Sequence, residues 1–276
     1  MDIALVSLFG LIAGSFLNVC IHRVPLGKSI VLPRSACPAC GHEIAFYDNI
    51  PLLSFALLRG RCRHCCAPIS WRYPAVEALN ALLWVSVWLA FGPGLSFFLY
   101  AAFCSAMLTL AFIDAYHRIL PHGITVTGLV LGFASAPWQA IHQRQAPELA
   151  RLLSLVGFSV THPLALGWIG ALLGLLAGAG MLLVVAVGYY LVKKAEGMGH
   201  GDIILMGFVG AVLGWPQTLL TIFLGSFLGA AAGVVLIRRA GGDRKYEIPF
   251  GTFLALAAVV SLLAGDRLLD WYWNLL

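Results

Sequence analysis

The chain has 276 residues, of which 61% are apolar and 11% are charged, whereas a soluble globular domain carries about 25% charged residues. This composition excludes a soluble two-domain protein, because so few polar side chains cannot cover so large an apolar core. The net charge of +5 indicates membrane topology rather than affinity for nucleic acid, because the basic residues lie in loops between apolar segments. The sequence therefore predicts an all-α polytopic protein in a lipid bilayer.

About eight segments are apolar enough to cross roughly 30 Å of hydrocarbon as helices. The first lacks the basic n-region and the A-x-A site of a cleaved signal peptide, so we interpret it as a retained span. The sixth is short and follows a glycine-rich turn, which indicates a broken or re-entrant helix sheltered by its neighbours. The segments cover residues 3–20, 75–92, 95–113, 121–141, 164–192, 202–215, 217–237 and 248–264.

The segment 164–192 carries small residues at about four-residue spacing. Gly170, Gly174 and Gly178 leave one side of this predicted helix without bulky side chains. Small residues at that spacing let two membrane helices approach closely. We therefore expect this face to pack against another helix.

The placement of charge sets the orientation in the membrane. With the N-terminus outside, every basic residue except Arg144, Arg151 and Arg267 falls on the inner side, as the positive-inside rule requires. Asp114 ends the third segment and Asp202 opens the sixth. Both acids are then expected at the cytoplasmic boundary of the membrane.

Residues 21–76 differ from the rest of the chain in composition. They hold most of its arginines and cysteines, many turn residues and no apolar run long enough to span a bilayer. We therefore divide the chain into a first transmembrane helix (1–20), a cytoplasmic loop domain (21–76) and a transmembrane bundle (77–276).

Two C-x-x-C motifs lie in the loop domain, Cys37 with Cys40 and Cys62 with Cys65. Each motif places two thiolates on one tight turn, and two such turns complete a closed tetrahedral site of four sulfurs, the arrangement of structural zinc. A domain of about 50 residues without a large apolar core needs such a metal to fold. The alternative is that the four cysteines are unmetallated thiols. Cys66, beside the second motif, is interpreted as an additional cysteine outside the four-sulfur site.

Asp114 and Asp202 are acids at the edges of apolar segments, where an unpaired carboxylate costs roughly 2.5 to 3.5 kcal/mol. Each acid alone has an ordinary interpretation. Asp114 is a charge that caps a span at the membrane interface, paired with Arg118. Asp202 is the N-terminal cap of its helix.

If the two carboxyl groups meet, they form an aspartyl dyad. Like charges a few ångströms apart cannot both ionise, so one group holds a proton near neutral pH. The ionised group then takes a proton from water while the other donates to the scissile carbonyl oxygen. Gly199 and Gly201 fit this chemistry, because a backbone without Cβ can approach an extended substrate closely. The pair therefore predicts a peptidase site that requires no metal.

The ordered motifs of this chain resemble those of the type IV prepilin peptidases, bacterial intramembrane aspartyl proteases with a G-x-G-D signature. The resemblance covers nearly the whole chain. Besides the two cysteine motifs and the Asp114 segment, it rests on Gly14-Ser15-Phe16-Leu17-Asn18-Val19, His22-Arg23-Val24-Pro25, Tyr47-Asp48-Asn49-Ile50-Pro51, Arg59-Gly60-Arg61-Cys62, Ile69-Ser70-Trp71-Arg72-Tyr73-Pro74 with Glu77, Gly199-His200-Gly201-Asp202 and Ile248-Pro249-Phe250-Gly251.

The resemblance implies a two-step enzyme in the bacterial inner membrane. It implies removal of the basic leader of type IV prepilins or pseudopilins at the cytoplasmic face, with Asp114 and Asp202 as catalytic acids. It also implies N-methylation of the new N-terminal residue from S-adenosylmethionine, in the N-terminal half with the zinc loop. Asp48, Asn49 and Glu77 are polar enough to contact the amine or the sulfonium, or they belong to turns and caps, so the residues that bind S-adenosylmethionine stay open.

Three positions depart from the family pattern. His122 follows Pro121 where the family usually has an acid, Ile204 stands where a lysine is usual, and Thr252 stands where proline is common. None of these departures removes a catalytic carboxylate. They bear on the rate and pH optimum of the reaction rather than on its type.

Two alternative functions are considered for this sequence. A transporter that uses the two acids as a proton or cation relay would need acids deeper in the spans and on both sides of the membrane. A non-catalytic relative would bind pilin precursors as an assembly factor, for which His122 and Ile204 are the supporting observations. The pilin or pseudopilin substrates, the appendage or secretion system and the oligomeric state stay open.

Overall fold

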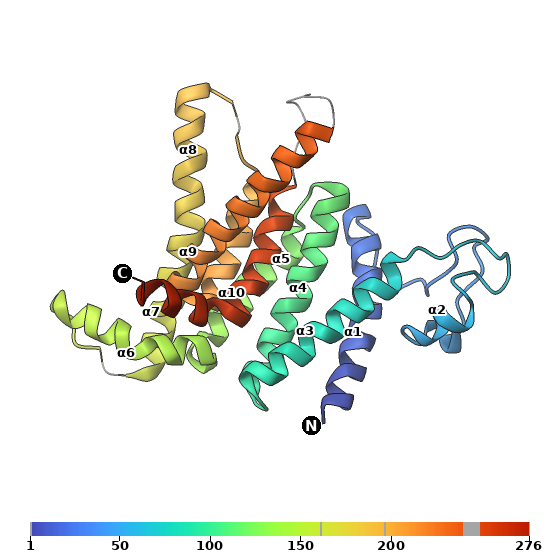
Figure 1. The fold of residues 1–276 in the computed structure, drawn as a ribbon, viewed down its shortest axis with the longest axis horizontal. Helices are drawn as coiled ribbons and strands as arrows, with labels where there is room; N and C mark the ends of the chain where they lie inside the picture. Colours follow the sequence, from blue (N-terminus) through green and yellow to red (C-terminus); the bar gives the residue numbers. More distant parts are fainter. Residues whose placement is uncertain (1, 161, 196, 240–248, 276) are drawn as a thin grey trace. The chain divides into compact units, whose positions relative to one another are not determined.

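The computed structural model describes residues 2–160, 162–195, 197–239 and 249–275. Within these ranges the chain is all-helical, which confirms the predicted fold class, and β-type pairing is limited to two isolated bridges. The elements in chain order (Figure 1) are α1 (Ile3–Arg23), η1 (Val24–Leu26), η2 (Phe46–Asn49), α2 (Leu53–Leu57), α3 (Arg72–Phe91), α4 (Leu95–His117), α5 (His122–Ser135), η3 (Ala136–Trp138), α6 (Ala140–Leu155), α7 (Pro163–Leu175), η4 (Leu176–Gly180), α8 (Met181–Lys193), α9 (His200–Arg239) and α10 (Phe250–Trp273).

The chain folds as two compact units, and the boundary between them lies inside α4. Unit 1 comprises Met1–Thr109 and unit 2 comprises Leu110–Leu276. The four paired cysteines belong to unit 1, and Asp114 and Asp202 belong to unit 2. Each candidate site therefore lies within a single unit.

Among the described residues, six helical segments are long and apolar enough to cross a membrane, and the bent pair α5 and α6 raises the number to at most seven. The six are α1, α3, α4, the run from α7 to α8, α9 and α10. The protein is therefore a multi-pass membrane protein with fewer spans than the eight expected. One part of the difference arises in α9, a single element that contains both of the predicted segments 202–215 and 217–237, and the other part arises in the bent pair α5 and α6, which covers the predicted segment 121–141.

The helix α9 reverses direction at Gly214, whose φ of 74° and ψ of 174° are not helical. Asp202, in the first turn of α9, lies beside Gly251 at the start of α10. Gln217, just past the reversal, lies beside Gly265 near the other end of α10. Gly225, further along α9, lies beside Leu254 near the start of α10, so the chain runs along α10 in one direction before Gly214 and in the opposite direction after it.

The first arm of α9, residues 200–213, is about 21 Å long at 1.5 Å per residue, which is shorter than the hydrocarbon core of a bilayer. Its side chains are largely covered by protein, as expected for a short helix sheltered by its neighbours. The buried members are Leu205, Met206, Phe208, Val209, Ala211, Val212 and Leu213.

Side chains of α6 bind the backbone carbonyls that the reversal leaves without helical partners. The Nε2 atom of His142 lies 3.0 Å from the carbonyl oxygen of Ala211. The amide of Gln145 donates to the carbonyl of Leu213 at 3.0 Å. Because backbone groups at membrane depth must be satisfied by protein, these contacts stabilise the sharp turn.

The glycines of α7 and η4 pack against the first arm of α9. A Cβ on Gly174 would collide with the carbonyl of Gly210, and a Cβ on Gly210 would collide with the carbonyl of Gly174. Gly178 approaches the carbonyl of Met206 in the same way. The expected close packing of this glycine face is therefore confirmed, except that Gly170 faces His142 on α6.

In unit 1, α1 and α3 pack through two glycines of α1. A Cβ on Gly10 would lie 2.7 Å from Cα of Ala81, and a Cβ on Gly14 would lie 2.7 Å from Cα of Glu77. The side chain of Asn80 joins the helices by donating to the carbonyl of Gly10 at 2.8 Å. Buried polar contacts and closely approaching backbones therefore contribute to holding this pair together.

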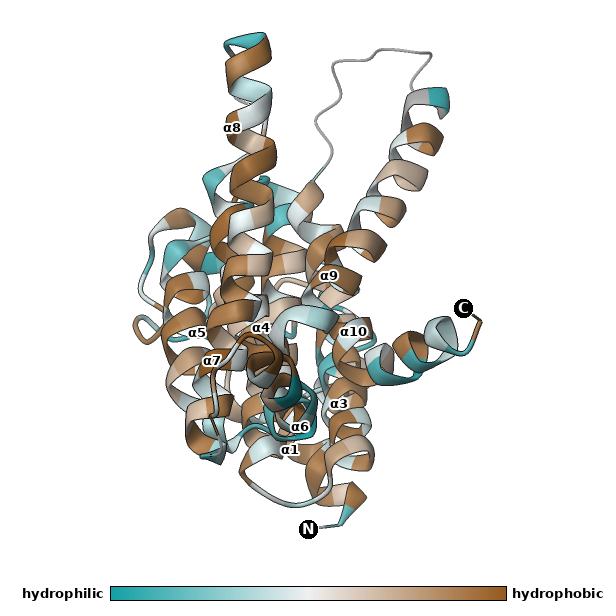
Figure 2. Cartoon of the chain, turned by 90° about the vertical axis from the view of Figure 1, so that its left-hand side faces the viewer, coloured by the Kyte–Doolittle hydropathy of each residue, from teal (hydrophilic) through white to brown (hydrophobic). Residues whose placement is uncertain are grey.

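Large apolar side chains are exposed along α8 and mark a surface for lipid. Figure 2 shows the apolar character of α8 over most of its length. The exposed members include Leu183, Val184, Val185, Val187 and Leu191. Contiguous apolar surface of this kind is expected where a helix faces hydrocarbon rather than water.

Candidate active site and metal centre

Asp114 and Asp202 meet at the start of α10. Asp114 lies in the last turn of α4 and is 6% exposed, and Asp202 lies in the first turn of α9. A Cβ on Gly251 would lie 3.2 Å from Cγ of Asp114 and 3.1 Å from Oδ1 of Asp202. The two carboxyl groups therefore border the same small space, which exists because residue 251 has no side chain.

Leu120 forms an apolar side of this space. Its Cδ1 atom would lie 2.9 Å from a Cβ on Gly251, and its Cβ atom would lie 2.9 Å from a Cβ on Gly201. Two glycines thus let one leucine pack directly beside the carboxyl groups. The absence of Cβ at Gly201 has a packing reason in addition to the substrate approach expected from the sequence.

Thr252 is the main hydrogen-bonding partner of Asp114. Its backbone N–H donates to Oδ2 of Asp114 at 2.6 Å, and its hydroxyl lies 2.9 Å from the same oxygen. Thr252 is the third residue of α10, where a helical N–H has no partner within its own helix. Asp114 thus supplies a negative charge at the N-terminus of α10, where the helix dipole favours it. The interfacial cap offered as an alternative for Asp114 exists, but it caps α10.

The glycine turn before Asp202 is exposed at its outer part. Gly199 and His200 are exposed, and a Cβ on Gly199 would lie 3.6 Å from Oδ2 of Asp202. Gly197 instead packs against the ring of Tyr189. Of the three glycines, Gly199 is therefore the one that borders both solvent and a carboxylate.

The other two departures from the family pattern lie near the starts of α5 and α9. His122 is exposed at the start of α5, and Ile204 is half-buried two residues after Asp202. Thr252, in contrast, contacts Asp114 directly. Ile248, the first residue of the last quoted motif, lies outside the described residues.

Four cysteine sulfurs gather in unit 1. The Sγ atoms of Cys37, Cys40, Cys62 and Cys65 all lie within 4.8 Å of one another, and those of Cys37 and Cys65 are 3.8 Å apart. Ligands 2.3 Å from a tetrahedral zinc ion are separated by about 3.8 Å. The donor set and its spacing therefore fit a four-coordinate metal ion, and Cys66 is not part of the cluster, as predicted.

The two C-x-x-C turns have matching backbones. An antiparallel bridge closes each turn, Ala36 with Glu43 in the first and Arg61 with Pro68 in the second. The residue after each second cysteine has a left-handed backbone. This residue is Gly41 in the first turn, with φ of 71°, and Cys66 in the second, with φ of 57°. Cys66 therefore fills a backbone position that favours glycine.

The thiols of the cluster do not ionise equally easily without a metal ion. The backbone N–H groups of Cys40 and Ala39 lower the pKa of the Cys37 thiol to about 6. The N–H of Ala67 favours the Cys65 thiolate, but desolvation and the neighbouring sulfurs raise the pKa of Cys65 to about 12. A metal cation bound here would supply the charge that lets all four sulfurs act as thiolates.

The three polar residues considered for the methyl-transfer site have different surroundings. Both oxygens of Asp48 accept bonds from Arg63, at 2.8 and 2.6 Å, and this pairing lowers the pKa of the Asp48 carboxyl. Asn49 is exposed. Glu77 is 7% exposed, and its Oε2 atom accepts the N–H of Leu52 at 2.9 Å. Asp48 therefore has a structural partner, whereas Glu77 is a buried acid.

Two residues of the dyad region were not predicted as site residues. Gly251 appeared only as part of a motif, and Thr252 only as a departure. Both could have been suspected from the Pro249-Phe250-Gly251 turn, which comes just before an apolar run and so indicates the start of a helix. The first turn of a helix presents free N–H groups that can bind a carboxylate. The sequence does not indicate which carboxylate those groups meet.

Two family models match the chain. Residues 8–91 match the bacterial peptidase A24 N-terminal domain, and residues 101–234 match the type IV leader peptidase family. No solved structure gives a significant match.

Full-length relatives match nearly the whole chain. The prepilin leader peptidase/N-methyltransferase of Aeromonas hydrophila is 36% identical over 98% of this chain and 93% of its own length. The protein of that name from Pseudomonas aeruginosa is 36% identical over 96% of this chain and 91% of its own length. The one from Burkholderia pseudomallei strain 1026b is 30% identical over 96% and 86%.

Proposed function

Because the chain belongs to the type IV leader peptidase family, we propose that it is a prepilin leader peptidase and N-methyltransferase. The first reaction hydrolyses the peptide bond after the leader of a prepilin or pseudopilin. The second methylates the new N-terminal amine. The single observation that carries the peptidase assignment is the meeting of Asp114 and Asp202 across Gly251.

Asp114 acts as the base of the cleavage reaction in this proposal. Its Oδ2 atom accepts two hydrogen bonds from Thr252, and such bonds favour the ionised carboxylate over the protonated acid. Asp114 takes a proton from water as the water oxygen bonds to the scissile carbonyl carbon.

Asp202 acts as the acid. It donates its proton to the carbonyl oxygen while the water attacks, which gives a neutral tetrahedral intermediate. When the C–N bond breaks, its electron pair stays on nitrogen, and the proton held by Asp114 passes to that leaving amine. The carbonyl reforms by returning its proton to Asp202, so both acids end in their starting states.

The methyl-transfer reaction belongs to unit 1 in this proposal. S-adenosylmethionine supplies an electrophilic methyl group when bound. The four paired cysteines would hold a structural zinc ion, which leaves no open coordination position for substrate. The role of these cysteines is to hold the two turns of the loop domain in place around the methyl-transfer site.

The proposed location is the bacterial inner membrane, with the N-terminus outside and Asp114 and Asp202 at the cytoplasmic face. The positive-inside distribution of basic residues supports this orientation. The substrates proposed are type IV prepilins or pseudopilins, in keeping with the names of the relatives.

Cleavage of a synthetic prepilin by the full-length protein tests the peptidase assignment. Asp114→Asn and Asp202→Asn each remove a proton-transfer group, so each should lower the cleavage rate at least about a hundredfold. Asp270→Asn, an exposed acid at the far end of α10, is the matched control and should cleave normally. Full cleavage by either dyad variant would refute the assignment. A wild-type protein that binds prepilin without cleaving it would point to the assembly factor.

A further inference from the structure

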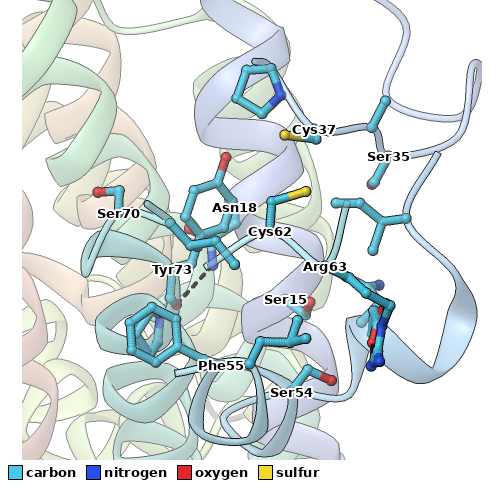
Figure 3. A pocket seen from close by; sticks show the side chains of 18 of the residues that line it. Ser15, Asn18, Ser35, Cys37, Ser54, Phe55, Cys62, Arg63, Ser70 and Tyr73 are labelled. Carbon is cyan, nitrogen blue, oxygen red and sulfur yellow. Dashed lines mark hydrogen bonds and ion pairs between the residues drawn. The ribbon is translucent and has the colours of Figure 1, made fainter. Parts of the chain in front are cut away.

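A cavity of about 450 Å³ lies in unit 1, outside the dyad. Its volume is in the range of small-molecule sites. Figure 3 shows the side chains of Ser15 and Asn18 from α1 gathered around the same space as Phe55 and Tyr73. The two cysteine turns form another part of the wall. The cavity is therefore a formed site in the unit to which the methyl transfer is assigned.

Asn18 brings a buried acceptor without a donor to this cavity. The residue is 2% exposed, and its amide nitrogen lies 3.1 Å from the carbonyl of Tyr73 and 3.4 Å from that of Gly14. Its Oδ1 atom is buried and has no hydrogen-bond partner among the described residues. A buried polar atom without a partner is unfavourable unless a ligand or water supplies one.

Glu77 adds a buried negative charge to the same wall. Its carboxylate accepts the N–H of Leu52 at 2.9 Å and interacts with the hydroxyl of Ser15. Within the described part of the chain, no basic side chain forms an ion pair with it. A buried carboxylate is stable only when a positive charge or several donors compensate it, so Glu77 favours a cationic ligand.

The remaining wall combines basic side chains, among them Arg23 and Arg72, with apolar and aromatic ones that suit a planar ring. Asp48 is already neutralised by Arg63, and the cysteine sulfurs face one another. Apolar and aromatic side chains line the space between them, namely Ile50, Phe55, Leu58, Ile69 and Tyr73. Such side chains pack favourably against a nucleobase.

We propose that this cavity binds the methyl donor, a nucleoside sulfonium with a primary ammonium group, and that Glu77 and Asn18 recognise its cationic end. Glu77 supplies the compensating charge, and Oδ1 of Asn18 accepts an N–H of the ammonium. The aromatic wall holds the nucleoside. This inference rests on the proposed N-methyltransferase function and assigns it a site.

Equilibrium dialysis of labelled S-adenosylmethionine against the full-length protein in nanodiscs tests the assignment. Glu77→Gln keeps the oxygen that accepts from Leu52 but loses the charge, and Asn18→Leu removes the free acceptor. Each should weaken binding about tenfold or more, with zinc content and leader cleavage retained. Glu43→Gln, an exposed acid on the rim of the same cavity, is the matched control and should bind as the wild type does.

The outcomes separate failure of the site from failure of the function. Wild-type affinity in both variants, with methylation intact in the wild type, overturns the cavity assignment alone. A wild-type protein that neither binds S-adenosylmethionine nor methylates overturns the N-methyltransferase function and this inference with it. If the variants instead weaken binding of a free-amine pilin peptide and leave S-adenosylmethionine binding unchanged, the cavity holds the amine and the assignment is wrong.

Discussion

The loop domain of unit 1 and the dyad of unit 2 are built in opposite ways. In the loop domain, each half of the cysteine cluster comes from one short turn, closed by its own backbone bridge. In the dyad, the contacting residues come from α4, α9 and α10, far apart in the sequence. The first kind of site depends on local geometry and can be held together by a metal ion, and the second depends on how helices pack.

This difference predicts separate vulnerabilities. A loop domain with few buried apolar side chains is expected to depend on a metal at its four cysteines for folding. A dyad placed by glycine contacts between helices depends on the space that those glycines leave. Damage to one region should therefore spare the chemistry of the other.

The largest effect is expected from Gly251→Ala. The added methyl would lie within 3.2 Å of Asp114, Asp202 and Leu120 atoms, so it fills the space between the two carboxyl groups. Leader cleavage in a synthetic prepilin assay should fall at least about a hundredfold, while methylation of a pre-cleaved peptide continues. Gly229→Ala is the control, because its nearest neighbour would be an ordinary contact at 3.5 Å. Normal cleavage by Gly251→Ala would show that catalysis does not need the space between the two carboxyl groups.

Loss of the metal should act on unit 1 alone. Cys62→Ser removes one of four ligands, so we expect bound zinc, measured by native mass spectrometry, to be lost and the loop around residues 35–68 to become protease-sensitive. Methylation should be lost with it, and leader cleavage should persist. Cys66→Ser should keep the metal. Zinc retained at the wild-type level in Cys62→Ser would contradict the four-sulfur site.

Thr252→Val should have an intermediate effect. It removes the hydroxyl next to Asp114 but keeps the backbone N–H, so one of two bonds to a charged group is lost. The cleavage rate should fall roughly tenfold. Thr252→Ser keeps both donors and should cleave at close to the wild-type rate. Equal rates for the valine and serine variants would show that the hydroxyl does not contribute.

The smallest effect is expected from Cys66→Gly. Cys66 has a left-handed backbone that a side chain disfavours by roughly 1 to 2 kcal/mol. Glycine should therefore stabilise the loop domain, partly offset by the greater freedom of the unfolded chain. Thermal unfolding of the zinc-loaded protein measures the change. A lower unfolding temperature would show that the Cys66 side chain has a stabilising contact.

The sequence predicted most of the loop domain and less of the dyad's surroundings. The spacing of Cys37, Cys40, Cys62 and Cys65 was sufficient because both halves of the cluster are local. Asp114 and Asp202 were paired because they were acids at the same predicted boundary. Thr252 and Gly251 were not assigned to the site, because only the packing of α10 shows which carboxylate its first turn contacts.

The number of spans was predicted only approximately, because 202–215 and 217–237 belong to one element, α9, and the bent pair α5 and α6 counts as at most one span. The two segments were correctly separated near Gly214, and the first is short, as the sequence predicted. Hydropathy marks apolar runs and glycines, yet it does not reveal that α6 supplies His142 and Gln145 to bind the carbonyls of the reversal.

In the proposed function, peptide cleavage and methyl transfer take place at two sites in two separate units. The most direct measurement follows both reactions of Asp202→Asn by mass spectrometry, with intact prepilin in one reaction and the pre-cleaved peptide in the other. If the two sites are separate, intact prepilin stays uncleaved while the pre-cleaved peptide is methylated at the wild-type rate. Loss of methylation together with cleavage in this folded variant would contradict this proposal.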